Sequence, residues 1–289
     1  MNPAPFTYHK AANLDEAIGL LGTHGADAKV LAGGHSLLPI MKLRLVEPDH
    51  LIDLSAVEEL RGIAVADGVL RIGALTTHHQ LERDLLVRDH ALVLAEAAGQ
   101  VGDRQVRNRG TVGGALAHAD AAADYPAAIL ALDATVVARG PAGERRIAAA
   151  EFFVDLLTTA LEPDELLTAV EVPVLPGRAG GSYQKLANQA SGYALVGVAA
   201  VVVLDVAGRC AEARVGVTGA VASGRRAGAT EALLRGAALD ETAIASAAAR
   251  VGDGLDLLDD LHASAEYRRR VLVGLTRRAV TSAAERANA

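Results

Sequence analysis

Gly33 and Gly34 are the residues whose type and setting most directly suggest chemistry in this chain. They follow a short apolar run, 30–32, and precede the small polar pair His35 and Ser36. This pattern predicts a buried strand that breaks into a tight turn. Glycine permits positive φ and lets an anion approach the main chain without a Cβ in the way, so the backbone N–H groups of such a turn suit a diphosphate. A plain turn is the alternative, because a glycine pair after a strand is a weak motif on its own.

A second glycine pair lies in the segment 111–115, which reads Thr-Val-Gly-Gly-Ala. We expect two such turns, one in each of two early subdomains, to hold one long dinucleotide from both sides. Neither is a Walker loop, since no Gly-Lys-Ser/Thr follows. Neither is a Rossmann fingerprint, since the G-x-G-x-x-G spacing and a following helix start are missing. The sequence therefore predicts a dinucleotide that is held in another way.

The composition of the 289 residues narrows the class of function. The net charge is −7 and no stripe of Lys and Arg occurs, which argues against nucleic acid. Cys210 is the only cysteine, so the chain offers no internal disulfide and too few thiolates for an iron–sulfur cluster. No helical pair of histidines with a nearby carboxylate suggests zinc, and the adjacent His78 and His79 would not share one face of a helix or strand. The sequence therefore predicts no metal site.

No targeting or membrane segment is expected. The N-terminus lacks a charged region followed by an apolar one, and the most apolar segment, 194–204, is too short to span a bilayer. We therefore expect a cytoplasmic protein with no transmembrane segment. Apolar residues make up 51% and aromatic residues only 3%, which predicts an aliphatic core divided over two or three subdomains.

Hydrophobic periodicity divides the chain into three parts. Asn13, with Glu16 three residues later, predicts a helix cap, and strands are expected at 28–32 and 51–54, so the first 55 residues form a small α/β unit. The middle part is expected to hold a hairpin around Asp67-Gly68, helices from about 78, at 92–101 and at 127–132, and strands at 134–137 and 167–173. The stretch 173–181, rich in Pro and Gly, indicates a boundary. Beyond it we expect a strand from 182 and a hairpin of strands 194–205 and 211–219 around Ala207-Gly208. Helices are expected at 230–235, 240–251 and 264–287, the last capped by Ser264.

Two polar segments near the second glycine pair have two interpretations each. Residues 103–109 read Asp-Arg-Gln-Val-Arg-Asn-Arg. They form either a solvated loop or a set of arginines that shape the approach of a diphosphate or dock a partner. Asp124, just before Pro126, is either a helix N-cap or a ligand-binding side chain.

As a set, these residues resemble the FAD-binding medium subunits of molybdenum hydroxylases, which include aerobic carbon monoxide dehydrogenase, xanthine dehydrogenase and bacterial N-heterocycle dehydrogenases. The resemblance rests on the segments 32–36 and 107–114, on Asp124 and on 183–185, and it is closest to the medium subunit of aerobic carbon monoxide dehydrogenase. It implies an α+β chain. A two-subdomain FAD-binding fold of the p-cresol methylhydroxylase type would occupy 1–55 and 56–176, and an α+β domain with a small antiparallel sheet and helices would occupy 177–289.

The resemblance also implies a site that holds FAD without a covalent bond. The two glycine segments would follow the diphosphate and ribityl chain, Asp124 would contact the nucleotide, Leu167 would pack on the cofactor, and Lys185 and Tyr193 would lie near the flavin ring. For Tyr193, a core aromatic is the alternative. Many members carry Asn, Asp or Ser where this chain has Ala115, so one side-chain contact is expected to be lost there. The implied site comprises Lys29, Val30, Leu31, Ala32, Gly33, Gly34, His35, Ser36, Leu37, Thr111, Gly113, Gly114, Ala115, Asp124, Leu167, Lys185 and Tyr193.

The implied function is electron transfer within a larger enzyme. Electrons would come from [2Fe-2S] clusters on a small iron–sulfur subunit, with the molybdenum cofactor on a large subunit, and leave FAD for an acceptor such as quinone or NAD. A dimer of heterotrimers, peripheral at the inner face of the membrane through the complex, fits this role. Alternatives are the medium subunit of an N-heterocycle, xanthine or aldehyde dehydrogenase, or a self-sufficient flavin oxidase or reductase that tethers its flavin through His35. A flavin-free scaffold is disfavoured by the two glycine turns.

Overall fold

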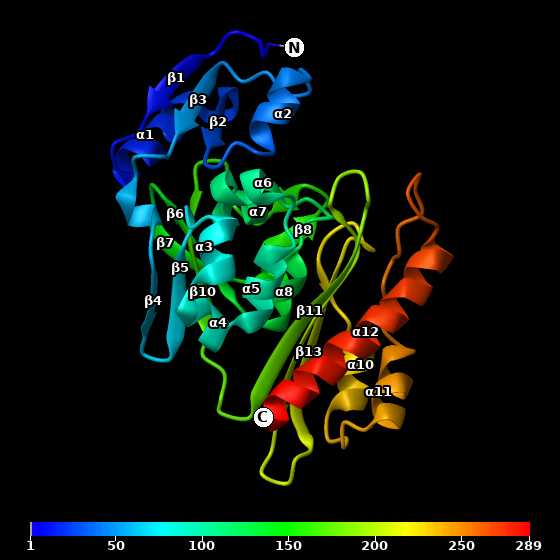
Figure 1. Ribbon diagram of the computed structural model, residues 1–289. Helices are drawn as coiled ribbons and strands as arrows, with labels where there is room; N and C mark the ends of the chain where they lie inside the picture. Colours follow the sequence, from blue (N-terminus) through cyan, green and yellow to red (C-terminus); the bar gives the residue numbers. More distant parts are fainter. Residues whose placement is uncertain (1) are drawn as a thin grey trace.

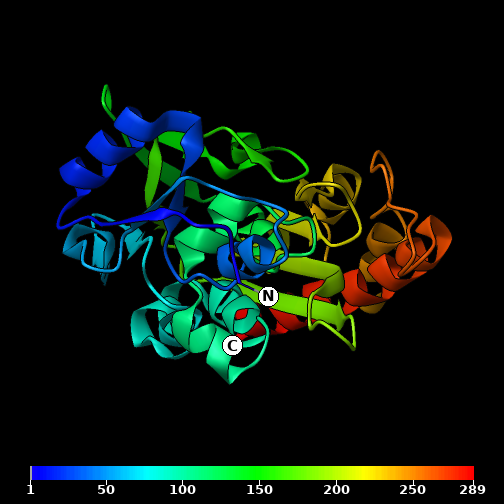
Figure 2. The ribbon, with the colours of Figure 1, turned by 90° about the horizontal axis from the view of Figure 1, so that it is seen from above.

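The computed structural model describes residues 2–289 and builds them around three sheets that follow one another along the chain (Figure 1). The sheets have three, five and four strands, and a short two-stranded ribbon is inserted in the second part. Helices accompany mainly antiparallel strands, which confirms the predicted α+β class. From above, α1 and the C-terminal helices lie on opposite sides of the molecule (Figure 2).

The first sheet is parallel, with strand order β1-β3-β2. As predicted, Asn13 caps the first helix, because its side chain accepts a hydrogen bond of 2.9 Å from the N–H of Glu16. The apolar stripe of this helix is buried against the sheet. The elements of this first part of the chain are β1 (Thr7–Lys10), α1 (Leu14–His24), β2 (Ala28–Leu31), α2 (Leu37–Lys42) and β3 (His50–Asp53), with 3-10 turns at Gly25–Asp27 and Glu58–Leu60.

The second sheet is antiparallel, with strand order β4-β5-β10-β6-β7. Its strands are β4 (Ile63–Ala66), β5 (Val69–Gly73), β6 (Thr135–Gly140), β7 (Gly143–Ala148) and β10 (Leu166–Pro173), and the inserted ribbon is β8 (Phe153–Asp155) with β9 (Thr158–Thr159). The β4–β5 hairpin turns at Asp67 and Gly68, as predicted, and both residues have positive φ (51° and 74°).

Seven helices of this second part are α3 (His78–Arg83), α4 (Leu85–His90), α5 (Leu92–Gly99), α6 (Arg104–Arg109), α7 (Val112–His118), α8 (Tyr125–Ala131) and α9 (Ala149–Phe152). The solvated loop that was one interpretation of 103–109 is wrong, since α6 occupies it. Asp103 starts this helix by accepting a hydrogen bond of 2.8 Å from the N–H of Val106.

The third sheet has strand order β11-β12-β13-β14 and carries helices on both faces. Its elements are β11 (Ala179–Ala187), β12 (Ala194–Leu204), β13 (Cys210–Thr218), β14 (Arg225–Arg226), α10 (Gly228–Leu234), α11 (Glu241–Ala248) and α12 (Ala265–Asn288). The predicted hairpin around Gly208 and the Ser264 cap of the last helix are both confirmed.

Alternate residues of β12 point into two different cores. Ala199 and Val201 belong to the core that α5 and α8 form with the second sheet, whereas Val198 and Val202 pack with α12. Because successive strand residues point to opposite faces, the third sheet separates these two layers of helices (Figure 1). The second and third parts therefore share one core, and the third part has a further core under α12. The first part packs in a separate core, to which Leu75 and Leu166 of the second part contribute.

Candidate functional site

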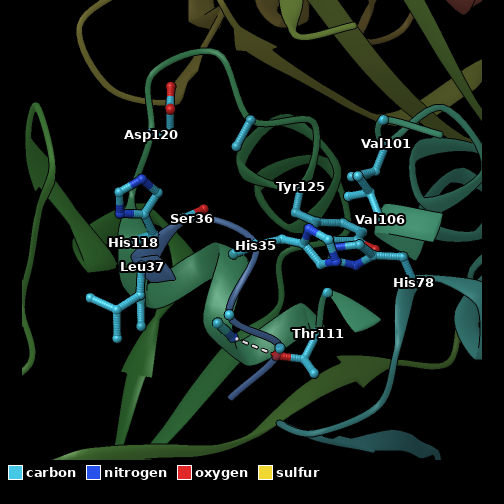
Figure 3. A pocket seen from close by; sticks show the side chains of 18 of the residues that line it. His35, Ser36, Leu37, His78, Val101, Val106, Thr111, His118, Asp120 and Tyr125 are labelled. Carbon is cyan, nitrogen blue, oxygen red and sulfur yellow. Dashed lines mark hydrogen bonds between the residues drawn. The ribbon is translucent and has the colours of Figure 1, made fainter. Parts of the chain in front are cut away.

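A cavity of about 590 Å³ lies where the three parts of the chain meet. It is lined by the first glycine segment, the start of α7, the start of α8 and the loop 191–193. Figure 3 labels His35, Ser36, Thr111 and Tyr125 of this lining. Among the residues predicted for the site, those in the wall are Lys29, Val30, Gly33, Gly34, His35, Ser36, Leu37, Thr111, Gly114, Ala115, Asp124 and Tyr193.

The first glycine segment presents free backbone donors to this cavity. In the part of the chain that the structure describes, the N–H groups of Gly33, Gly34, His35 and Ser36 have no protein acceptor. Gly34 has φ +78°, a conformation that L side chains rarely adopt. A run of successive unpaired N–H groups is a backbone anion site. This arrangement supports the predicted diphosphate contact.

The second glycine pair has a different role, and the expectation of two equivalent open turns is wrong. Thr111 caps α7, accepting a hydrogen bond of 3.1 Å from the N–H of Gly114 (dashed in Figure 3). The N–H of Gly113 donates to Ala74 O, and that of Ala115 to Thr111 O. Helix α7 begins directly at this pair and α2 begins soon after the first, so the expected absence of helix starts is also wrong.

The two glycine segments contact each other and form one continuous wall. An ideal Cβ on Gly33 would lie 2.3 Å from Arg109 O and 2.7 Å from the Cα of Gly110. A Cβ on Gly114 would lie 3.7 Å from the Cβ of Ala32. Gly33 is therefore required by protein packing between the first and second parts of the chain.

A buried ion pair lies beneath the wall of the cavity. Lys185 Nζ is 2.9 Å from Asp124 Oδ1 and donates 2.9 Å to Gln100 O. The same Oδ1 accepts a hydrogen bond of 2.6 Å from the hydroxyl of Tyr183. Burial raises the pKa of the Asp124 carboxyl, and the Lys185 ammonium opposes this rise. The Asp124 side chain makes no hydrogen bond as a cap of α8, so the N-cap interpretation is wrong.

His78 and Tyr125 form a second polar pair in the wall that sequence reasoning missed. Tyr125 Oη and His78 Nδ1 are 2.7 Å apart, and both side chains are buried. Burial lowers the pKa of His78 to about 4, assisted by His35 and Arg107, so this imidazole is neutral at pH 7. Figure 3 shows His35 projecting toward this pair. Thr77 and Gln80 form a capping box that starts α3, where the sequence predicted a helix from about residue 78.

Five predicted residues do not line the cavity. Leu31, Ala32 and Gly113 lie behind its wall, Lys185 reaches it only through Asp124, and Leu167 belongs to the core of the second sheet. Further residues of the wall, outside the implied site, are Ile40, Val46, His78, Val101, Gly102, Val106, Gly110, Ala117, His118, Asp120, Ala123, Tyr125, Leu157, Ser191 and Gly192.

Tyr193 lies at the edge of the cavity and is 42% exposed, so the alternative of a core aromatic is wrong. Its loop is held by Asn188, whose N–H donates to Tyr193 O at 2.8 Å and whose O accepts from the N–H of Gly192. Partial burial raises the pKa of Tyr193, assisted by Asp120, so the phenol is neutral at pH 7. No helix among residues 2–289 is both long and apolar enough to cross a membrane.

Comparison with known proteins adds two family matches. Residues 4–175 match the FAD-binding domain in molybdopterin dehydrogenase, and residues 181–283 match the C-terminal domain of carbon monoxide dehydrogenase flavoproteins. The chain is 38% identical to subunit alpha of the 6-hydroxypseudooxynicotine dehydrogenase complex of Paenarthrobacter nicotinovorans, covering 99% of this chain and 97% of that one.

The chain is also 37% identical to the carbon monoxide dehydrogenase medium chain of Hydrogenophaga pseudoflava, covering 98% of each. A solved structure of carbon monoxide dehydrogenase from the same organism, lacking the Mo-pyranopterin moiety of the molybdenum cofactor, superimposes with a TM-score of 0.95. That match is 38% identical and covers 99% of both chains.

Proposed function

This chain belongs to the FAD-binding medium subunits of carbon monoxide dehydrogenase-like molybdenum hydroxylases, a family of oxidoreductases, and on that premise we propose that it carries electrons from a partner's [2Fe-2S] clusters through FAD to an external acceptor. A quinone is the acceptor we favour. The partners are a small iron–sulfur subunit and a large molybdenum subunit, assembled as a dimer of heterotrimers. Within the chain, we assign residues 1–55 and 56–176 to the FAD-binding subdomains and 177–289 to the C-terminal domain.

The observation that carries the proposal is the row of unpaired backbone N–H groups from Gly33 to Ser36 along a cavity of about 590 Å³. That volume lies within the range of roughly 300–1,000 Å³ that small-molecule sites occupy. Several donors in succession fit the diphosphate of FAD better than a single phosphate.

Other residues of the wall serve orientation. Tyr193, at the edge of the cavity, would cover an aromatic ring. The Asp124–Lys185 pair joins the start of α8 to the end of β11 beneath it. FAD supplies the redox chemistry when bound, and the protein supplies position and electrostatics. Cys210 is buried and is the only cysteine of the chain, whereas an iron–sulfur cluster needs four thiolates. We therefore assign the iron–sulfur clusters to the partner.

The test is anaerobic absorbance of the FAD-loaded chain, alone and with its two partners. Alone, the flavin is expected to bleach with dithionite and to stay oxidised with carbon monoxide or any hydroxylase substrate. Adding both partner subunits should give bleaching driven by the substrate. Bleaching of the solitary chain by substrate would instead support a self-sufficient flavin oxidase or reductase.

A second candidate differs in the substrate of the complex. The identity to the subunit of a 6-hydroxypseudooxynicotine dehydrogenase complex equals or exceeds that to the carbon monoxide dehydrogenase chain. An N-heterocycle hydroxylase complex is therefore the alternative setting for the same electron-transfer role. Offering carbon monoxide and N-heterocycles in turn to the reconstituted complex separates the two, because bleaching follows only the proper substrate.

A further inference from the structure

Three histidines that are far apart in the sequence come together on the first sheet. His9 lies in β1, His24 ends α1 and His50 begins β3. One ring nitrogen from each lies within 4.8 Å of the others, and all three side chains are partly buried. None of the three lines the cavity described above. The cluster is therefore separate from the proposed FAD site.

The fold builds this cluster by strand register and by the length of α1. β1 and β3 are parallel neighbours in which Thr7 pairs with His50 and His9 with Ile52. Because residues two apart share a face, His9 and His50 are diagonal neighbours on one face of the sheet. The last residue of α1 then brings His24 over the same face, where its ring stacks on His50 with centroids 3.7 Å apart and an angle of 17°.

The distances suit a shared metal ion. His9 Nε2 and His50 Nδ1 are 3.0 Å apart, and the His9 ring lies 4.9 Å from that of His24 and 5.2 Å from that of His50. Zinc binds imidazole nitrogens at about 2.0–2.1 Å in tetrahedral geometry, which places two ligand nitrogens about 3.4 Å apart. The three ring nitrogens lie within 4.8 Å of one another, so they must move slightly closer together to bind one ion. Rotation of the His24 ring away from its stacked position on His50 would bring its nitrogen closer.

We propose that His9, His24 and His50 form a zinc site on the first sheet, with three protein ligands and a fourth position open to solvent. Zinc is the ion of choice because three imidazoles without a thiolate or a bidentate carboxylate fit its tetrahedral preference. Such an ion would tie the end of α1 to β1 and β3. The prediction of no metal site considered only histidines that are close together in the sequence. His9, His24 and His50 are far apart in the sequence and meet only in the folded chain.

The experiment is zinc titration of the full, FAD-loaded chain produced without a polyhistidine tag and dialysed against a chelator. We expect one zinc ion per chain by calorimetry and an upward shift in Tm. The variant His24→Gln should bind at least about tenfold more weakly, since losing even a residue that only supports a metal ligand costs 10–100-fold. His90→Gln, which alters a partly buried histidine in α4, is the matched control and should bind as the natural chain does.

Imidazole ¹⁵N shifts provide a second readout that does not depend on the variants. On addition of zinc, the shifts of the three clustered histidines should move together while that of His90 stays fixed. No saturable binding at micromolar zinc, or equal affinity in folded His24→Gln, would overturn the site. If His24→Gln fails to fold, the shifts decide alone: movement limited to other histidines also overturns it.

Discussion

Replacing Lys185 with methionine tests how the ion pair beneath the cavity supports the fold. The Lys185 side chain is 2% exposed and that of Asp124 is 5% exposed. Methionine keeps much of the volume of lysine but removes the ammonium. The variant therefore leaves a buried carboxylate whose hydrogen bond from Tyr183 persists, and the C-terminal carbonyl of α5 at Gln100 loses its donor.

The magnitude follows from the burial of both partners. Removing one member of a buried pair costs about 3–5 kcal/mol of unfolding free energy. In a chain of 289 residues that corresponds to a fall in Tm of roughly 5–8 °C, at about 2.1 cal/mol/K of unfolding entropy per residue. Arg270→Met is the matched control, because Arg270 and Glu266 are exposed partners one turn apart on α12. Its loss should be no more than about 0.5 kcal/mol.

The pH dependence gives the prediction its sharpest form. Burial already raises the pKa of Asp124, and loss of the opposing Lys185 charge raises it further. A carboxyl whose pKa is raised in the folded state binds more protons there than in the unfolded chain, so its contribution to stability is lost as the pH rises through the folded pKa. The deficit of Lys185→Met should therefore be larger at pH 8 than at pH 5.

Urea denaturation at both pH values is the assay, with Asp124→Asn/Lys185→Met as the double variant. The double variant should regain part of the stability lost by the single one, because no buried charge is left unpaired. A single-variant deficit below about 1 kcal/mol, or a deficit that grows toward acid pH, would refute the reasoning from burial.

Three further outcomes are expected. Gly34→Val should lose FAD. Gly236 has the same φ of +78° with open space around it, so Gly236→Val should carry a similar backbone strain of about 1–3 kcal/mol and still bind FAD. Equal flavin content in both variants would contradict the role of the first glycine turn. Acid precipitation should leave the yellow colour in the supernatant, and His35→Gln should still bind FAD; colour in the pellet would show a covalent bond. The stability of the natural chain should fall by about 2–3 kcal/mol as the pH drops from 6.5 toward 4, because folded His78 has a pKa of about 4 and protonates only when the chain unfolds. Urea titration of His78→Gln should lack that component, and an unchanged slope would contradict it.

Elements with strong local signals could be predicted from the sequence. The Asn13 and Ser264 caps, the Asp67-Gly68 turn and the strands of the third sheet each follow from residues close together in the chain. The open first glycine segment also follows, because nothing nearby in sequence competes for its donors.

The rest depends on contacts between distant segments. The donors of the second glycine pair are used by Thr111 and by Ala74, which is remote in sequence, so their availability could not be judged from the motif. Leu167 was placed on the cofactor, but the register of β10 shifts between Leu167 and Ala169, and the face a residue takes beside such an irregularity is not set by simple alternation. His78 was visible only as the first residue of a helix.

The core shared by the second and third parts also has a consequence for synthesis on the ribosome. Residues from Leu70 to Val172 complete that core only together with Tyr183, Ala199 and Val201. At about 5–20 residues per second, the roughly 30 residues after Val172 take on the order of 1.5–6 s to be made. During that interval the apolar surfaces of α5 and α8 lack their cover, so the nascent chain passes through a stage in which chaperone binding or premature association competes with folding.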